Sequence, residues 1–335
     1  MAESTPLVSV ISAYYNREDY VQESIQSLLD QSYKNLEIII VDDGSTDNTL
    51  ERLREFDDPR LKIVTHENMG LVRSFIKAID MSKGEYIAIH GSGDLSLPQR
   101  IEKQAALLQE NPSVGVVGCY VNNINTVTNY EMVRKIDVAR QALDQLKAKN
   151  PYTHGEVMYR RSVYEKAGGY RTFFKFGQDY DLWLRMSLIT EFDVVKDILY
   201  TRFQLADGVE LSVEKKAMQI YLSDFAIQCV NYRLEHGKDL LDIYQERAAL
   251  MRKPSKTVAQ KLHVLSKKVL FQRQIELAKK LNAWSVQEHR GIANSAVQGF
   301  AYIASKSPRL EQLSFDLLFR TRKVYQGLRS GQASS

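Results

Sequence analysis

The sequence predicts an α/β protein in which a mostly parallel sheet is followed by a helical C-terminal region. Short apolar runs rich in β-branched residues alternate with amphipathic segments up to about residue 205, and from Ser212 onward helical periodicity replaces the strand pattern. Such alternation is typical of βαβ units with right-handed crossovers. We therefore expect a sheet-containing domain over residues 1–210 and a basic helical region over residues 211–335.

The first half of the chain shows this alternation clearly. The run Ile38 to Val41 is β-branched throughout and too short for a helix, as expected of a central strand covered on both faces. Gly44 then allows a sharp turn, and Ser45, Thr46 or Asp47 can cap the next helix. Strands are expected at residues 7–13, 38–41, 61–65 and 85–89, and helices at residues 18–31, 45–56, 71–81 and 97–110.

The second half is less regular. We expect strands at residues 114–119, 157–160, 192–195 and 198–203, a polar segment at 122–129, and helices at 133–149, 162–167 and 179–188. The first turn of the last helix is acidic, as the helix dipole favours. Asp181 and Arg185 are one turn apart in it and can pair, and Trp183 is expected to pack on the sheet. Helices follow from Ser212, with breaks near Gly237, Pro254, Trp284 and Pro308.

Composition restricts the cellular setting. Cys119 and Cys229 lie far apart in a chain of 335 residues and show no metal-ligand spacing, which favours a reduced, cytoplasmic location. No apolar run approaches the roughly 20 residues that span a bilayer, and the N-terminus lacks an export signal. The net charge of +4 is uneven, because residues 252–330 hold 16 Lys and Arg against 4 Asp and Glu.

The segment from Val41 to Asp47 combines the end of a buried strand with acidic side chains. Open α/β sheets bind ligands at the carboxyl ends of their strands, so Asp42 and Asp43 are candidate ligand-binding residues. An ordinary capped turn would use the same residue types, since Asp-Gly-Ser is common turn chemistry.

Six motifs that occur in one order along the chain favour the ligand-binding interpretation. They are Ser12-Ala13-Tyr14-Tyr15-Asn16, Val41 to Asp47, Glu67-Asn68-Met69-Gly70, Ser96 to Arg100, Gly168-Gly169-Tyr170 and Gln178 to Arg185. Together they resemble glycosyltransferase family 2, the inverting enzymes with a Rossmann-like GT-A fold that use nucleotide-diphosphate sugars, over residues 5–205. The resemblance implies transfer of a sugar, of the hexosyltransferase type and with a UDP-sugar favoured, to a glycan or lipid-linked acceptor in surface polysaccharide synthesis.

The resemblance also assigns residues to the nucleotide. In the family, the loop after the first strand and one aspartate after the second bind base and ribose. Carried over by position, these roles fall on Ala13, Tyr15, Asp42 and Asp43, with Arg73 as an additional contact. The structural alternative is that Tyr15 belongs to the core and Asp42 caps a turn.

The metal motif is where the chain departs from the family. Most members carry Asp-x-Asp after the fourth strand, whereas this chain has His90-Gly91-Ser92-Gly93-Asp94. We expect Asp94 to hold Mg²⁺ or Mn²⁺, with His90 or Asp43 behind it, since such ions take further ligands from phosphates. The alternative is that backbone N–H groups around Ser92 and Gly93 bind the phosphates without a metal. A third reading is a nucleotide-sugar-binding protein with impaired catalysis.

The general base is expected at Asp179, the position at which the family places this residue, with Gln178 where the family usually has Glu. An inverting transfer is one in-line displacement, so one carboxylate must accept the acceptor proton. His154 precedes a short strand, at a position where relatives often have histidine. It is expected to line the donor-sugar or acceptor pocket, unless it is a structural histidine.

The basic C-terminal region suggests a surface partner. Predicted helices at residues 257–281 and 310–328 mix apolar and basic residues, as helices that lie on anionic membranes do. We therefore expect peripheral binding to the inner face of the cell membrane. The alternative is packing of these stripes within a homo-oligomer. Nucleic acid is not an expected partner, because no reading motif accompanies the basic charge.

Overall fold

The structure is a computed structural model that describes residues 5–205 and 212–306, and the chain forms two compact units. The first unit contains the chain up to Ser212 together with Cys229–Glu246. The second unit contains Val213–Gln228 and the chain from Arg247 onward. Helix α8 (Val213–His236) therefore contributes residues to both units. The domain division predicted between residues 210 and 211 falls outside the described residues.

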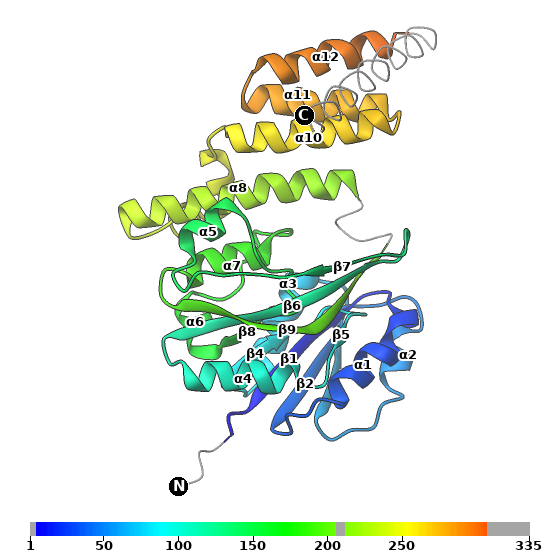
Figure 1. Cartoon of the computed structure of the whole chain (residues 1–335), viewed down its shortest axis with the longest axis vertical. Coiled ribbons are helices and arrows are strands. Elements are labelled where there is room, and N and C mark those ends of the chain that lie inside the picture. Colours follow the sequence, from blue (N-terminus) through cyan, green and yellow to red (C-terminus); the bar gives the residue numbers. More distant parts are fainter. Residues whose placement is uncertain (1–4, 206–211, 307–335) are drawn as a thin grey trace, which may run out of the picture. The chain divides into compact units, whose positions relative to one another are not determined.

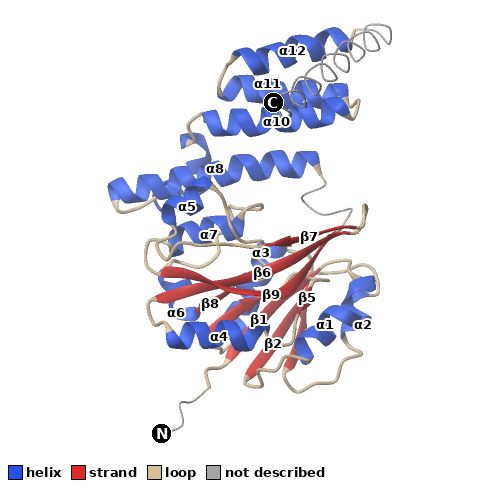
Figure 2. Cartoon of the chain, in the orientation of Figure 1, coloured by secondary structure: helices blue, strands red, loops and turns tan. Residues whose placement is uncertain are grey.

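One nine-stranded sheet forms the centre of the first unit, in the order β3-β2-β1-β4-β8-β6-β9-β5, with β7 paired to β6 (Figure 2). The strands β3, β2, β1 and β4 are parallel, as are β6 and β9, which confirms the mostly parallel α/β sheet predicted from the alternation. The strands are β1 (Val8–Tyr14), β2 (Leu36–Asp42), β3 (Leu61–Thr65), β4 (Tyr86–Ile89), β5 (Leu95–Ser96), β6 (Val114–Asn125), β7 (Tyr130–Arg134), β8 (Met158–Arg160) and β9 (Glu191–Gln204).

Helices cover both faces of this sheet. In Figure 1, α1 and α4 lie in front of the sheet and α3 lies behind it. The helices of this unit are η1 (Glu18–Tyr20), α1 (Val21–Leu29), α2 (Thr49–Leu53), α3 (Leu71–Met81), α4 (Arg100–Glu110), α5 (Leu143–Ala148), α6 (Arg161–Lys166), α7 (Gln178–Met186) and α9 (Leu240–Tyr244), followed by η2 (Gln245–Met251) at the junction with the second unit.

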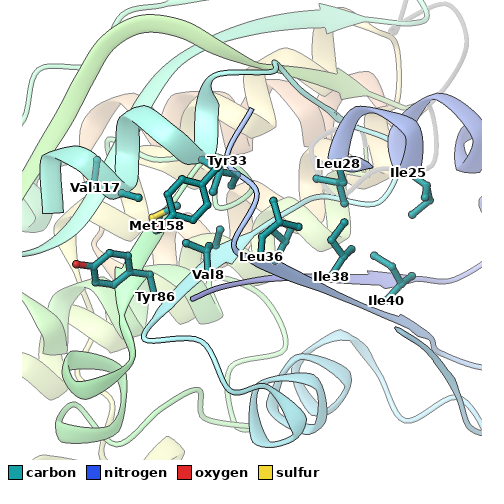
Figure 3. Packing of buried hydrophobic residues seen from close by; sticks show 14 of the residues in the cluster. Val8, Ile25, Leu28, Tyr33, Leu36, Ile38, Ile40, Tyr86, Val117 and Met158 are labelled. Atoms are coloured by element: carbon teal, nitrogen blue, oxygen red, sulfur yellow. The ribbon is translucent and has the colours of Figure 1, made fainter. Parts of the chain in front are cut away.

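The core on the α1 and α4 face follows the strand period of two. Val8 and Val10 of β1 and Ile38 and Ile40 of β2 point the same way and are fully buried. Figure 3 shows Ile25 and Leu28 of α1 packed in this cluster, alongside Tyr86, Val117 and Met158. All residues of β1, and all residues of β2 except Glu37, are buried, which explains why neither strand exposes a polar face.

The helix predicted over residues 133–149 is wrong. Strand β7 ends at Arg134, and only the six residues of α5 are helical. The polar segment predicted at 122–129 is likewise partly strand, because β6 continues to Asn125 and forms a hairpin with β7. The strand residues of this segment include three asparagines, a residue type that is depleted in strands, so residue type gave no sign of the hairpin pairing.

Two predicted strands, at 192–195 and 198–203, form the single strand β9. Its parallel pairing with β6 continues from Glu191 to Gln204, with register shifts where Cys119 and Tyr120 of β6 face it. These irregularities accommodate the exposed polar residues between Val195 and Ile198, which the sequence pattern suggested were a break.

The second unit contains α10 (Lys256–Phe271), α11 (Ile275–Glu288) and α12 (Ile292–Ala304), whose buried residues include Leu262, Val269 and Leu281. The helix predicted at 257–281 is interrupted at Arg273, which has a left-handed φ of 59°. The break predicted near Trp284 is wrong: this residue lies within α11 with its ring against Tyr221.

Breaks near Gly237 and Pro254 are confirmed, because α8 ends before Gly237 and α10 begins after Pro254. Pro308 and the helix predicted at 310–328 fall outside the described residues. Among the helices at residues 5–205 and 212–306, none is long and apolar enough to cross a membrane.

Candidate active site

The loops that follow β1 and β2 are joined at the carboxyl edge of the sheet. The Ser45 hydroxyl accepts a hydrogen bond from the Asn16 N–H at 3.0 Å, and the Asn16 side-chain oxygen accepts one from the Thr46 N–H at 2.8 Å. Asn16 has a left-handed φ of 50°, which an Asn side chain tolerates better than most. These bonds fix the loop around Tyr15, whose ring is 45% exposed, while Ala13 is buried within β1.

Asp42 stabilises the turn that follows β2. Its carboxylate accepts hydrogen bonds from the Thr65 hydroxyl at 2.9 Å and from the Ser45 N–H at 3.3 Å, and only 1% of the residue is exposed. The structure therefore places Asp42 at the predicted edge, with both oxygens engaged by the protein. Such a carboxylate fixes the conformation of the loop after β2.

Asp43 organises the entry to α3. Its two oxygens accept the backbone N–H groups of Met69 and Gly70 at 2.9 and 3.0 Å, and Gly70 adopts a left-handed φ of 89°. His66 lies 3.5 Å away from the same carboxylate. This arrangement fixes the first turn of α3, in which Arg73 is exposed.

Asp94 follows β4 and is turned toward β9. The Tyr200 hydroxyl donates to one carboxylate oxygen at 2.7 Å, and the Phe203 N–H donates to the other at 3.0 Å. The same Tyr200 hydroxyl accepts the Gly91 N–H at 2.8 Å. Burial raises the pKa of Asp94 to about 6, because desolvation outweighs these hydrogen bonds and the charge of Arg202, which lower the pKa.

The two glycines of this loop sit where a side chain has no room. A Cβ on Gly91 would lie 2.2 Å from an Asp94 carboxylate oxygen, and one on Gly93 would lie 2.9 Å from Cβ of Tyr20. Gly93 also has a φ of 93°, which L side chains rarely adopt. Ser92 between them is half-buried. The packing of this loop therefore requires glycine at both positions and leaves no room for the carboxylates of the family motif.

His90 is a structural residue. It is fully buried, and its Nε2 is hydrogen-bonded to the Ser24 hydroxyl of α1 at 2.9 Å. Burial, reinforced by the charge of Arg100, lowers the pKa of His90 to about 3. His90 is therefore neutral under physiological conditions and carries no positive charge toward a phosphate.

His154 lies in the loop before β8 with an unusual backbone. Its φ is 89°, a conformation that is strained for a residue with a side chain and that concentrates at functional sites. Its Nε2 is 2.7 Å from the Tyr170 hydroxyl, and its ring meets Phe75 of α3 edge-on at 5.2 Å. Burial lowers the pKa of His154, although the nearby Asp179 raises it.

Asp179 occupies the first turn of α7, as predicted. It remains partly exposed, and the Asn150 side chain donates to its carboxylate at 3.3 Å. Its neighbour Gln178 is buried. The N-terminus of α7 stabilises negative charge at this position. Asp179 is therefore a partly solvated carboxylate next to His154.

A buried ion pair anchors α7 behind Asp179. Arg185 donates to the Asp181 carboxylate at 2.7 Å and to the Gly169 carbonyl at 2.7 Å, which confirms the predicted Asp181–Arg185 pair. Trp183 is fully buried, in agreement with its predicted packing role. The turn at Gly169 and the start of α7 are thus held together.

Arg202 of β9 is a charged residue of this site that the sequence did not reveal. Its charge lowers the pKa values of both Asp94 and His154, so its guanidinium group lies near both. No motif surrounds it, and it reaches the site only because β9 pairs along β6 and β5. The alternation of side chains at the end of β9 was the one signal in the sequence that could have placed Arg202 on the same face of the strand as Tyr200.

These contacts bring the predicted residues into two connected groups. Tyr15, Asp42 and Asp43 lie at or directly after the ends of β1 and β2, and Arg73 lies in the first turn of α3. Arg202 lies near both Asp94 and His154, and Asp179 lies near His154. Phe75 connects the groups, since it belongs to the helix that Asp43 positions and its ring contacts His154 and Tyr170.

The residues around Asp94 do not fit a divalent cation. Mg²⁺ and Mn²⁺ need oxygen ligands that face open space shared with phosphates. Both Asp94 oxygens already accept protein hydrogen bonds, and the backbone of Gly91 packs on one of them. Over residues 5–205 and 212–306, no three His, Cys, Asp or Glu side chains gather into a possible metal site. The predicted metal role of Asp94 thus finds no support in its geometry.

Known proteins resemble this chain in sequence and in fold. The model of glycosyl transferase family 2 matches residues 9–168. EpsE of Bacillus subtilis (strain 168), whose name describes it as a glycosyltransferase, is 37% identical over 190 residues, which cover 54% of this chain and 67% of EpsE. The O-antigen biosynthesis glycosyltransferase WbnJ of Escherichia coli is 33% identical over 184 residues, covering 54% of this chain and 71% of WbnJ.

Two solved structures share the fold at low sequence identity. The mannosyltransferase PcManGT from Pyrobaculum calidifontis, in complex with GDP-Man and Mn²⁺, gives a TM-score of 0.53 at 18% identity, with 88% of each chain covered. S. aureus TarS 1-349, in complex with UDP-GlcNAc, gives 0.51 at 17% identity, covering 88% of this chain and 89% of TarS. With the GT-A-like fold and the extent of the match to EpsE and WbnJ, the chain belongs to glycosyl transferase family 2.

Proposed function

We propose that this protein is an inverting, hexosyltransferase-type enzyme that transfers a sugar from a nucleotide-diphosphate donor to a hydroxyl of a glycan or lipid-linked acceptor. The observation that carries the proposal is the grouping of Asp179, His154 and Arg202, which the ring of Phe75 connects to the helix that Asp43 positions. A carboxylate, a buried histidine and a cation therefore lie close together. The name of WbnJ, an O-antigen biosynthesis glycosyltransferase, supports a role in bacterial surface polysaccharide synthesis.

The nucleoside end of the donor is assigned to the loops after β1 and β2. Tyr15 offers an exposed ring on which a base can stack, and the loop hydrogen bonds hold that ring in place. Asp42 and Asp43 keep these loops and the start of α3 in position, with Arg73 as an additional contact to the nucleoside. A UDP-sugar is the donor that the family resemblance favours; TarS was solved with UDP-GlcNAc, whereas PcManGT was solved with GDP-Man.

The chemical step is assigned to Asp179. The acceptor hydroxyl attacks the anomeric carbon from the face opposite the diphosphate, and Asp179 accepts the hydroxyl proton. Its partial exposure in the first turn of α7 allows contact with an acceptor. His154 and Tyr170 form a fixed wall beside it through their 2.7 Å hydrogen bond.

Asp179→Asn tests this assignment. The variant should lose about 10²- to 10⁴-fold in transfer rate, because the amide cannot accept the proton, while donor affinity stays unchanged. Single-turnover transfer and calorimetric donor binding measure the two quantities. Glu165→Gln removes an exposed carboxylate of α6 and serves as the control for charge loss. A variant that retained more than about a tenth of the wild-type rate would remove Asp179 from the mechanism.

A nucleotide-sugar-binding protein with impaired catalysis is the second candidate, and the glycines at positions 91 and 93 favour it. Nucleotide release separates the two functions. An enzyme releases nucleoside diphosphate when donor and acceptor are supplied together. A binding protein shows donor-induced thermal stabilisation without release.

The partner surface of the second unit is proposed to be an anionic membrane. On α10, Lys261, Val264 and Lys268 are exposed and lie on one face, so that an apolar side chain is flanked by two cations. Such a face suits the headgroup region of an anionic bilayer. Packing between copies of this chain is the alternative occupant of the same face.

A further inference from the structure

The diphosphate of a nucleotide sugar carries charge that must be balanced in the transition state. In the loop after β4, Gly91 and Gly93 supply no side chain, and the packing leaves no space for one. The remaining acid, Asp94, is turned toward Tyr200 and Phe203 and held there by hydrogen bonds at 2.7 and 3.0 Å. The positive charge that balances the diphosphate must therefore come from another source.

Arg202 has the right position to supply it. Residues 200 to 204 of β9 pair regularly with residues 121 to 125 of β6, so Tyr200 and Arg202 project from the same face of the strand. The Tyr200 hydroxyl on that face reaches both Asp94 and the Gly91 N–H. Arg202 lies two residues after Tyr200 in the strand, and it directly precedes Phe203, whose backbone N–H donates to Asp94. It is half-buried, so part of its side chain reaches solvent.

Three other basic side chains of this region differ from Arg202 in position or charge. Arg100 is fully buried, donates to the Ile89 carbonyl at 2.6 Å and lies over the Tyr200 ring at 4.8 Å. His90 is neutral, because burial lowers its pKa to about 3. Arg73 is exposed, but it belongs to the first turn of α3. The charge of Arg202 acts on both Asp94 and His154, so it lies near both.

We propose that Arg202 replaces the divalent cation of the family: its guanidinium binds the donor diphosphate, so that donor binding and sugar transfer require no added metal ion. The inference rests on the proposed glycosyl transfer. In that step the acceptor oxygen forms a bond to the anomeric carbon while the bond from that carbon to the diphosphate oxygen breaks. The electron pair leaves with the diphosphate, and the acceptor proton passes to Asp179.

Guanidinium chemistry suits this role. Arginine presents parallel N–H donors that match two phosphate oxygens, and it keeps its charge at any physiological pH. A charge-assisted hydrogen bond of this kind contributes enough to change affinity about 10- to 100-fold. Lysine at the same place would keep the charge but lose the two parallel N–H donors. Substitution by lysine and by glutamine should therefore weaken diphosphate binding to different degrees.

The test uses the full-length protein, with UDP and GDP as probes, and isothermal titration calorimetry in excess EDTA and then in excess Mn²⁺. At least one of the two diphosphates should bind in EDTA, and Mn²⁺ should change its affinity by less than about threefold. Arg202→Gln should weaken that binding by about 10- to 100-fold. The affinity of Arg202→Lys should lie between those of wild type and Arg202→Gln. The corresponding nucleoside, which lacks phosphates, should bind wild type and Arg202→Gln equally.

Arg54→Gln, which removes an exposed arginine at the end of α2, is the matched control and should bind UDP or GDP as wild type does. Equal nucleoside binding by Arg202→Gln shows that its nucleoside loops are folded. Diphosphate binding that required Mn²⁺, or that Arg202→Gln left unchanged, would overturn the role of Arg202 and leave the glycosyl transfer standing. Failure of UDP, GDP and their nucleosides to bind under either condition would overturn the proposed function itself.

Discussion

At the scale of single residues, the loop after β4 shows how one change in a motif alters its surroundings. Gly91 packs against the Asp94 carboxylate, and Gly93 packs against Tyr20, so each glycine is required by close approach of its neighbours. The carboxylate that survives is buried and bonded to β9. A residue that resembles a metal ligand in the sequence thus fastens two strands together in the fold.

The raised pKa of Asp94 predicts how stability depends on pH. Burial lifts this pKa from 3.8 to about 6, so the folded protein holds the proton more tightly than the unfolded chain does. Stability from Asp94 is therefore fully present below about pH 4 and is lost as the pH rises to about 6. Relative to Asp94→Asn, wild type should lose roughly 2–3 kcal/mol of unfolding free energy between those pH values.

Urea unfolding of wild type and Asp94→Asn at a series of pH values measures this difference. Asp57→Asn, at an exposed position, controls for the loss of one acidic group. Curves of wild type and Asp94→Asn that stayed parallel across this range would show that the Asp94 carboxyl is not desolvated in the folded protein.

At the scale of elements, the position of α7 depends on a helix distant in sequence. Asp239 caps α9 by accepting the N–H groups of Leu241 and Asp242 at 2.9 and 3.0 Å. Its carboxylate also pairs with Arg171 at 2.6 Å, and Arg171 lies 3.8 Å from Asp181 in the first turn of α7. A charge network therefore links the end of α8 and α9 to the helix that carries Asp179.

Asp239→Ala should disrupt this network. Burial alone would raise the pKa of Asp239, but hydrogen bonds and charge from Arg171 and Arg233 outweigh it and hold the pKa below its ordinary value. Removing the carboxylate leaves the buried Arg171 charge poorly compensated, which should cost about 3–5 kcal/mol of unfolding free energy. Transfer by the folded fraction should show a lower kcat, with little change in the KM for the donor, because α7 carries Asp179.

Asp242→Asn is the matched control for this change. Asp242 belongs to the same capping box, but its side chain is 34% exposed; it pairs with Arg233 and lies 3.5 Å from Arg171. Its loss should cost no more than about 1 kcal/mol. Equal destabilisation by the two variants would show that the buried Asp239 carboxylate contributes no more to this network than the partly exposed Asp242 carboxylate does.

At the scale of the whole molecule, the chain separates into a sheet unit and a helical unit, and α8 belongs to both. Cys229–Glu246 lies with the sheet unit, so a truncation before α8 would remove part of the catalytic unit along with the basic helices. Substitutions on α10 are therefore the cleaner test of membrane binding.

Lys261→Glu combined with Lys268→Glu should lower co-sedimentation with anionic phosphatidylserine vesicles at low salt. Each basic residue near such a surface contributes about 1 kcal/mol, so reversing two should reduce partitioning by at least about tenfold. Lys62→Glu with Lys83→Glu reverses two exposed charges of the sheet unit and is the control. Equal binding by the two double variants would contradict a membrane-facing α10, and a change in oligomeric state would favour self-association instead.

The extent of prediction from sequence differs across the site. The strand ends bearing Asp42 and Asp43 and the helix start bearing Asp179 were all predicted, because local patterns of apolar runs, turns and caps mark them. The β7 hairpin and the continuous β9 were missed, because exposed polar strands carry no periodic signal and depend on their partner β6. Arg202 was missed for the same reason.

The sequence by itself determined the α/β class, the order of the strands along the chain, the family and the candidate acids, since each of these follows from residue types at short spacing. Only the tertiary structure decided what those acids contact: Asp94 faces β9 rather than open space, and Arg202 comes to lie near both Asp94 and His154. The physical reason is that hydrogen bonds and desolvation act between residues more than 100 positions apart, here Asp94 and Tyr200, and no local pattern records that pairing.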